Sequence, residues 1–247
     1  MHCEKPKIIE MQNVGMCYPQ GDMALRDVDL CIHEGDFVAI TGRNGGGKTT
    51  LVRLILQLLK PTAGAITYYR KGEQVKRLNM GYLPQKNSID NRFPITIDEV
   101  VASGLDSMNR FFHRRNSSDD SAVQNALAMV GLSDLRHKGI GEISGGQLQR
   151  ALLARAIIGC REVLVLDEPL SYLDQHYEQR LYQLIAQLSR HATIIMVSHD
   201  VSVVSAMANR HFIVERTLHE CHCHHHMLAT RCTDADLPAA FGPKTTE

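Results

Sequence analysis

Residues 37–50 read FVAITGRNGGGKTT, and this stretch decides the fold. The short apolar run over residues 37–41 is bounded by glycine, and such a run predicts a buried β-strand. Residues 42–49 match the pattern G-x-x-x-x-G-K-[ST] at every position. The apolar residues after Thr50 predict a helix, so the glycine-rich loop would lie between a strand and a helix N-terminus.

A loop of this kind binds phosphate groups. Its glycines let successive backbone N–H groups curl around an anion, and the helix dipole favours negative charge there. Lys48 can reach the β- and γ-phosphates, and the Thr49 hydroxyl can ligate Mg²⁺. A plain glycine-rich turn is the alternative, but a full match in this context disfavours it. The candidate phosphate-site residues are Gly42, Asn44, Gly45, Gly46, Gly47, Lys48, Thr49 and Thr50.

A phosphate loop that supports hydrolysis needs an acidic element to hold Mg²⁺ and orient water. Residues 163–168, VLVLDE, predict a buried strand with two carboxylates at its C-terminal tip. Ligands bind at that edge of open α/β sheets. We expect Asp167 to contact Mg²⁺ through water and Glu168 to act as general base on the attacking water. Alone, the pair could equally be two solvated acids.

The pattern along the chain predicts an α/β fold with a mostly parallel sheet flanked by helices. Apolar runs at residues 37–40, 163–166 and 193–197 are the clearest strands. Between the last two, apolar residues at helical spacing predict a helix and therefore a βαβ unit. They are Leu181, Leu184, Ile185 and Leu188.

Two further parts and a tail complete the expected organisation. Residues 28–32 alternate between apolar and polar, which predicts an N-terminal antiparallel β subdomain. Strand signals fade from residue 86 to about residue 140, so we expect an inserted α-helical subdomain at about residues 86–160. Within it, residues 110–120 would be a charged surface loop and residues 121–130 a helix. Regular patterning ends near Leu218. Residues 1–218 would form the ATPase domain, and residues 219–247 a weakly structured tail.

Composition excludes several classes of protein. Lys+Arg and Asp+Glu are equal at 27 each, so the chain lacks the basic excess of a nucleic-acid binder. No signal-like segment and no apolar run long enough to span a membrane stands out, which predicts a cytosolic protein. The 7 cysteines, an odd number, do not indicate a disulfide framework.

Residues 143–150, ISGGQLQR, lie between the two phosphate-site elements. Ser144 is a good N-cap, and Gln147 completes a capping box for a helix over residues 148–158. The segment could therefore be only a well-capped helix. However, Ser144, Gly145 and Gly146 also form an uncovered helix N-terminus suited to a phosphate.

Here the chain resembles the ATP-binding subunits of ABC transporters, whose signature reads LSGGQ. The resemblance covers about residues 7–215, and Ile143 replaces the leucine. It implies that Tyr18 stacks on adenine, Gln85 touches the Mg²⁺ and water site, and His199 lies near the γ-phosphate. It also implies that Asp174 belongs to the D-loop. Arg43 and Tyr172 depart from the residues common in the family without removing a phosphate ligand.

The resemblance implies a mechanism and partners. Two subunits would form a homodimer in the presence of ATP, each ATP lying between the phosphate loop of one and residues 144–147 of the other. Closure and hydrolysis would drive a separate integral-membrane permease that receives its cargo from a substrate-binding protein. The subunit would sit peripherally on the cytoplasmic face of the inner membrane.

Residues 82–90 and 93–97, YLPQKNSID and FPITI, resemble the zinc/manganese group of importers. A haem or amino-acid importer, or a soluble regulatory ABC ATPase, remains the alternative. The tail carries an independent hint, because thiolate and imidazole together suit Zn²⁺ or copper. A low-complexity terminus that binds metal only in the test tube is the alternative there. The candidate tail ligands are His219, Cys221, His222, Cys223, His224, His225 and His226.

Overall fold

The computed structural model describes residues 5–85, 90, 92–105, 115–160, 162–169, 175–199, 204 and 207–221. Within them, the first sheet is antiparallel with strand order β2-β1-β4-β5. Its long strands β1 (Lys7–Cys17) and β2 (Met23–His33) pair with each other, and β4 (Ala63–Arg70) and β5 (Glu73–Val75) follow. The expected N-terminal antiparallel part is therefore confirmed.

The second sheet is mostly parallel and carries the strand that precedes the glycine-rich loop. In the described part of the chain its order is β10-β9-β3-β8-β7-β6. β10 alone pairs antiparallel, with β9, whereas the other neighbours pair in parallel. The strands are β3 (Phe37–Thr41), β6 (Met80–Leu83), β7 (Val163–Asp167), β8 (Thr193–Val197), β9 (Arg210–Glu215) and β10 (Thr217–Cys221).

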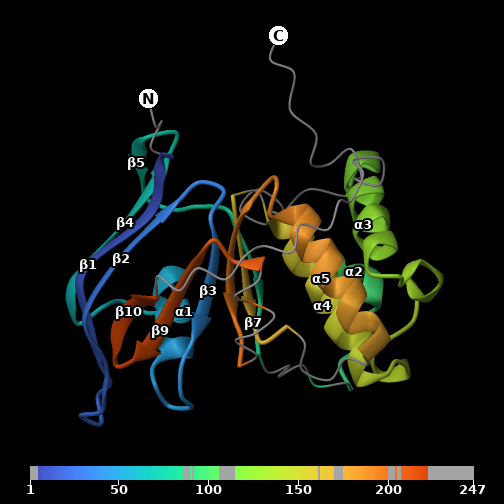
Figure 1. The fold of residues 1–247 in the computed structure, drawn as a ribbon. Helices are drawn as coiled ribbons and strands as arrows, with labels where there is room; N and C mark the ends of the chain where they lie inside the picture. Colours follow the sequence, from blue (N-terminus) through green and yellow to red (C-terminus); the bar gives the residue numbers. More distant parts are fainter. Residues whose placement is uncertain are drawn as a thin grey trace.

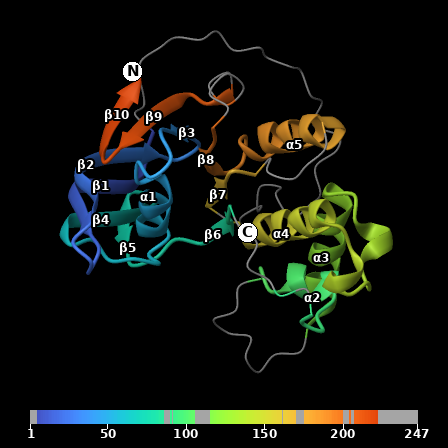
Figure 2. The same cartoon turned by 90° about the horizontal axis from the view of Figure 1, so that it is seen from below.

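Helices cover both faces of the parallel sheet. Figures 1 and 2 show α1 (Lys48–Ile55) between the two sheets and the other helices across the parallel sheet from it. The others are α2 (Ile97–Ala102), α3 (Ser117–Met129), α4 (Gly145–Gly159) and α5 (Gln175–Leu188), with short 3-10 turns at Ser133–Leu135 and Ile140–Glu142. The predicted βαβ unit is confirmed as β7, α5 and β8. No helix among the described residues is long and apolar enough to cross a bilayer.

The parallel strands are apolar on both faces because each face has its own core. Ala39, Leu164 and Met196 pack with the helices α2 to α5. Their chain neighbours Val38 and Val165 point the other way, toward α1 and the antiparallel sheet. Successive side chains of a strand alternate between faces, so a continuous apolar run is what a doubly covered strand requires.

One expected loop contains the start of a helix. Residues 110–120 were expected to be surface loop, but α3 begins at Ser117. Asn116 caps it: its side chain accepts a hydrogen bond from the Asp119 N–H at 2.9 Å, and the Asp119 carboxylate accepts one from the Asn116 N–H at 3.2 Å. The polar residues that suggested a loop are thus a capping box.

The expected boundary of the tail is also wrong. Regular structure continues beyond Leu218 to Cys221, because β10 pairs with β9 over its whole length. Arg210 on β9 fixes the pair by donating to both carboxylate oxygens of Glu220, at 2.7 and 2.8 Å. His219 and Cys221 therefore belong to the sheet.

Candidate nucleotide-binding site

The glycine-rich loop joins β3 to α1 and wraps around the Lys48 side chain. The Lys48 ammonium is held inside the loop, where Nζ donates to the carbonyls of Gly42 at 2.8 Å and Arg43 at 3.0 Å. The residue is 7% exposed. Glycine is required where β9 packs on the loop, because a Cβ on Gly42 or Gly46 would lie 2.2 or 2.6 Å from the Val214 carbonyl oxygen.

The acidic pair lies at the tip of β7, as expected. Asp167 is 1% exposed. Its burial raises the pKa of its carboxyl to about 6, and the neighbouring carboxylate of Glu168 adds to this increase. One Asp167 oxygen, Oδ2, has no hydrogen-bond partner among the described residues. Glu168 has a positive φ of 51°, its N–H donates to the Val197 carbonyl at 3.0 Å, and its carboxylate contacts His199 Nε2.

A cavity of about 970 Å³ brings most of the predicted site residues together. Tyr18 closes one side, where its hydroxyl lies 3.1 Å from the Thr50 hydroxyl. Gly42 and Gly46 belong to the same loop, and Asp167 directly precedes Glu168. The predicted residues that line the cavity are Tyr18, Asn44, Gly45, Gly47, Lys48, Thr49, Thr50, Gln85, Glu168 and His199.

The donor set fits Mg²⁺. A hard cation of this size takes oxygen ligands and is commonly held by one or two protein groups together with substrate phosphates. The side chains of Thr49 and Gln85 line the cavity, and the unpaired oxygen of Asp167 is the kind of buried acceptor that a cation satisfies.

The segment Ser144 to Gln147 does not join this cavity. Ser144 caps α4, and the predicted capping box is confirmed: Gln147 N–H donates to Ser144 Oγ at 3.2 Å and Ser144 N–H donates to the Gln147 side chain at 2.9 Å. Ser144 and Gly145 are exposed. A Cβ added to Gly145 would meet no atom within 4 Å, so this helix end faces open space.

Several predicted residues lie outside the described part of the chain. These are Asp174 and the tail residues His222, Cys223, His224, His225 and His226. On β10, the His219 ring nitrogen lies 3.0 Å from the Thr217 hydroxyl. Among the residues that the structure describes, no group of three or more His, Cys, Asp and Glu side chains could hold a metal ion.

The cavity also has walls that the sequence did not indicate. No local motif marks these residues. Four of them lie between the end of β1 and the start of β2, and the fifth, Arg216, reaches the loop through the pairing of distant strands. β9 pairs with β3, and the β9–β10 turn therefore lies beside the glycine-rich loop. The additional lining residues are Gly21, Asp22, Met23, Ala24 and Arg216.

The strand–loop–helix unit and the acidic strand tip together define a P-loop nucleotide-binding ATPase. Comparison with known proteins identifies its family: residues 25–171 match the ABC transporter family model. The Listeria innocua "Zinc uptake system ATP-binding protein ZurA" is 35% identical over 91% of this chain and 90% of its own length. The Pasteurella multocida "Zinc import ATP-binding protein ZnuC" is 36% identical over 85% of this chain and 73% of its own length.

A solved structure supports the same family assignment. A dimeric ATP-binding cassette bound to ADP and Pi, in a post-hydrolysis state, superposes with a TM-score of 0.74 and 25% identity, covering 86% of this chain and 97% of that one. The chain belongs to the ABC transporter family. It is an ATP-binding subunit of that family, an ATPase whose hydrolysis is coupled to transport.

Proposed function

We propose that this chain is the motor subunit of an ABC importer for zinc or manganese. The observation that carries the proposal is the 970 Å³ cavity, which combines the P-loop, the acidic strand tip and His199 in one space. The metal substrate is supported by the relatives named for zinc uptake and import. It is also supported by the likeness of the segment after Tyr82 to the zinc/manganese group.

Within the cavity each group would have a separate task. Lys48 would anchor the β- and γ-phosphates from inside the loop, and Tyr18 would stack on the adenine. Glu168 would accept the proton of the attacking water, and its contact with His199 would orient the carboxylate. Thr49, Gln85 and Asp167 would hold Mg²⁺, which when bound neutralises charge on the phosphates.

The exposed end of α4 supports action as a dimer. Ser144, Gly145, Gly146 and Gln147 lie outside the cavity of their own chain, so we propose that they complete the ATP site of a second copy. Asp174 would lie at the same dimer interface. The dimer would dock on an integral-membrane permease at the cytoplasmic face of the membrane, and a substrate-binding protein would deliver the metal.

Metal accumulation in cells tests the transported substrate. Cells that lack this subunit should accumulate less zinc or manganese, and wild-type chain should restore uptake. The Glu168→Gln chain should be expressed but fail to restore it. Normal zinc and manganese levels, accompanied by a defect in haem or amino-acid uptake, would transfer the assignment to one of those importers. No transport defect with any substrate would favour a soluble regulatory ATPase.

We also propose that the tail binds a transition-metal ion through His219, Cys221 and residues 222–226. His219 and Cys221 are alternate residues of β10, so their side chains lie on one side of the strand. The remaining Cys and His residues follow directly in the sequence. Ligation needs thiolate and neutral imidazole.

Truncation after Cys221 should remove most of the metal binding and leave ATP hydrolysis largely intact. This end point keeps β10, which residues 1–218 would not. Calorimetric titration with Zn²⁺ compares the full-length and truncated chains. Binding by the full-length chain should weaken as the pH is lowered, because protons compete with the metal ion for thiolate and imidazole. Equal Zn²⁺ binding by the two chains would show that the tail residues after Cys221 do not form the metal site.

A further inference from the structure

The turn between β9 and β10 consists of Arg216, whose backbone is fixed to the P-loop. Its N–H donates to the carbonyl of Gly46 at 2.8 Å, and its own carbonyl accepts from the N–H of Arg26 on β2 at 2.7 Å. Its φ is 61°, in the left-handed region. Together with the close packing of Val214 on the loop glycines, these bonds hold Arg216 in one position relative to the phosphate-binding backbone.

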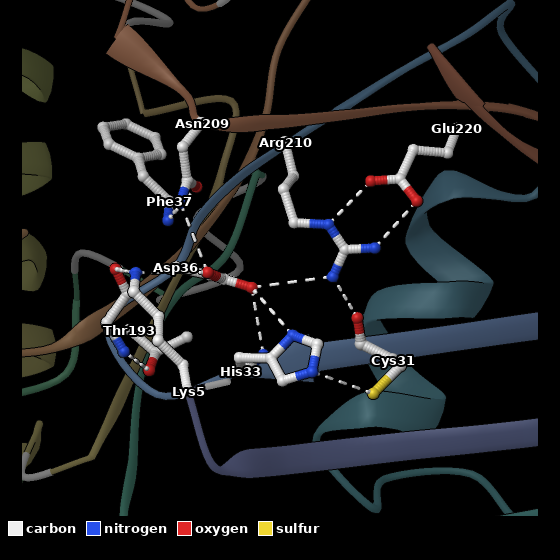
Figure 3. A network of polar contacts seen from close by, with 10 residues as sticks. Lys5, Cys31, His33, Asp36, Phe37, Thr193, Asn209, Arg210 and Glu220 are labelled. Carbon is white, nitrogen blue, oxygen red and sulfur yellow. Dashed lines mark hydrogen bonds and ion pairs between the residues drawn. The ribbon is translucent and has the colours of Figure 1, made fainter. Parts of the chain in front are cut away.

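Arg210 and Arg216, the two arginines of the β9–β10 hairpin, make different contacts. Figure 3 shows Arg210 surrounded by acceptors: it contacts Asp36, both oxygens of Glu220 and the Cys31 carbonyl. Its guanidinium therefore fastens β9 to β10 and β2. Arg216 is exposed and lines the nucleotide cavity, and within the described residues its guanidinium has no ion pair or hydrogen bond.

The backbone of Arg216 lies between the P-loop and β2, because it is bonded to Gly46 on one side and to Arg26 on the other. Met23 and Ala24, at the start of β2, line the cavity, as do Arg216 and Tyr18, the proposed adenine-stacking residue. Glu168 and His199, the proposed hydrolytic groups, come from the tips of β7 and β8 instead. A nucleotide would stack its adenine on Tyr18 and place its terminal phosphates on Lys48. Its α- and β-phosphates would then lie between the adenine and the hydrolytic groups.

We propose that Arg216 is a second nucleotide-binding cation, which contacts the phosphates nearest the ribose. Guanidinium presents paired N–H donors that match phosphate oxygens, and its positive charge adds to that of Lys48. The inference rests on the proposed ATP site. Because the contact would be made to phosphates that ADP retains, Arg216 contributes to nucleotide affinity and not to the hydrolytic step.

The test replaces the side chain without disturbing the turn. Arg216→Gly suits the positive φ and keeps both backbone hydrogen bonds. The dissociation constants for ATP and ADP should each rise by a similar factor, roughly 5- to 30-fold, the size of one or two kcal/mol. The KM for ATP should rise with these constants, and kcat should change by a much smaller factor. The difference between wild type and variant should shrink at high salt, since the site is exposed.

Two further variants separate binding from folding. Arg216→Lys keeps the charge and should recover part of the affinity. Arg26→Ala removes an exposed arginine on β2 that does not line the cavity, and should bind ATP like wild type. Wild-type affinity in Arg216→Gly overturns the inference. So does a weaker affinity in both Arg216 variants accompanied by a lower unfolding temperature. Failure of the wild-type chain itself to bind ATP would contradict the proposed function instead.

Discussion

The Glu168→Gln chain should bind ATP with nearly wild-type affinity and hydrolyse it roughly 10²–10⁴-fold more slowly, the usual contribution of a general base. Glutamine has the shape of glutamate but cannot accept the proton of the attacking water. The substitution keeps the side-chain length at a position with φ of 51°, and an amide can still hydrogen-bond to His199. Phosphate release under single-turnover conditions measures the effect.

A carboxylate far from the cavity provides the control. Glu73 is exposed on β5 of the antiparallel sheet, and Glu73→Gln removes the same charge there. We expect this variant to retain full turnover. If Glu168→Gln hydrolyses ATP at the rate of the Glu73→Gln chain, another group activates the water and the assigned role of Glu168 is wrong.

Gly145→Asp should prevent dimerisation on ATP without unfolding the subunit. Gly145 is exposed, and no atom lies within 4 Å of an added Cβ, so the new side chain has room. The helix dipole stabilises a carboxylate in the first turn of α4. In the closed dimer that carboxylate would face the γ-phosphate bound to the partner, and like charges repel. Nucleotide should still bind to each monomer through its own P-loop.

Size-exclusion chromatography in ATP measures this effect. The Glu168→Gln chain should elute as a dimer, since it binds ATP and hydrolyses it only slowly. Adding Gly145→Asp should return it to the monomer position, whereas the neutral Gly145→Asn should preserve much more of the dimer. Persistence of the dimer in the Glu168→Gln, Gly145→Asp double variant would leave Ser144 and Gln147 with the capping box as their only role.

The sequence predicted the parts of the site whose geometry is local. The loop from Gly42 to Thr49 and the tip at Asp167 are set by consecutive residues, so their strand, turn and helix context could be predicted without any tertiary information. The alternation that marked the N-terminal strands is local as well. These elements, and the capping box of Ser144, agree with the structure.

What the sequence did not predict depends on contacts between distant segments. Arg216 reaches the cavity because β9 pairs with β3, a register that no short motif encodes. The start of α3 was missed because Asn116 and Asp119 are typical of loops as well as of helix caps. The extension of β10 to Cys221 depends on its partner strand, and its polar residues alone gave no strand signal.

The most direct test of the ATP-site assignment is Mg²⁺-dependent ATP hydrolysis by wild-type and Lys48→Ala chains. Lys60→Ala, which removes an exposed lysine beyond α1, is the matched control. Lys48 is the ammonium enclosed by the P-loop, so its loss should abolish ATP binding and hydrolysis together. The wild-type and Lys60→Ala chains should hydrolyse ATP at the same rate, and only when Mg²⁺ is present. Wild-type hydrolysis by a correctly folded Lys48→Ala chain would contradict the assignment of this cavity as the ATP site.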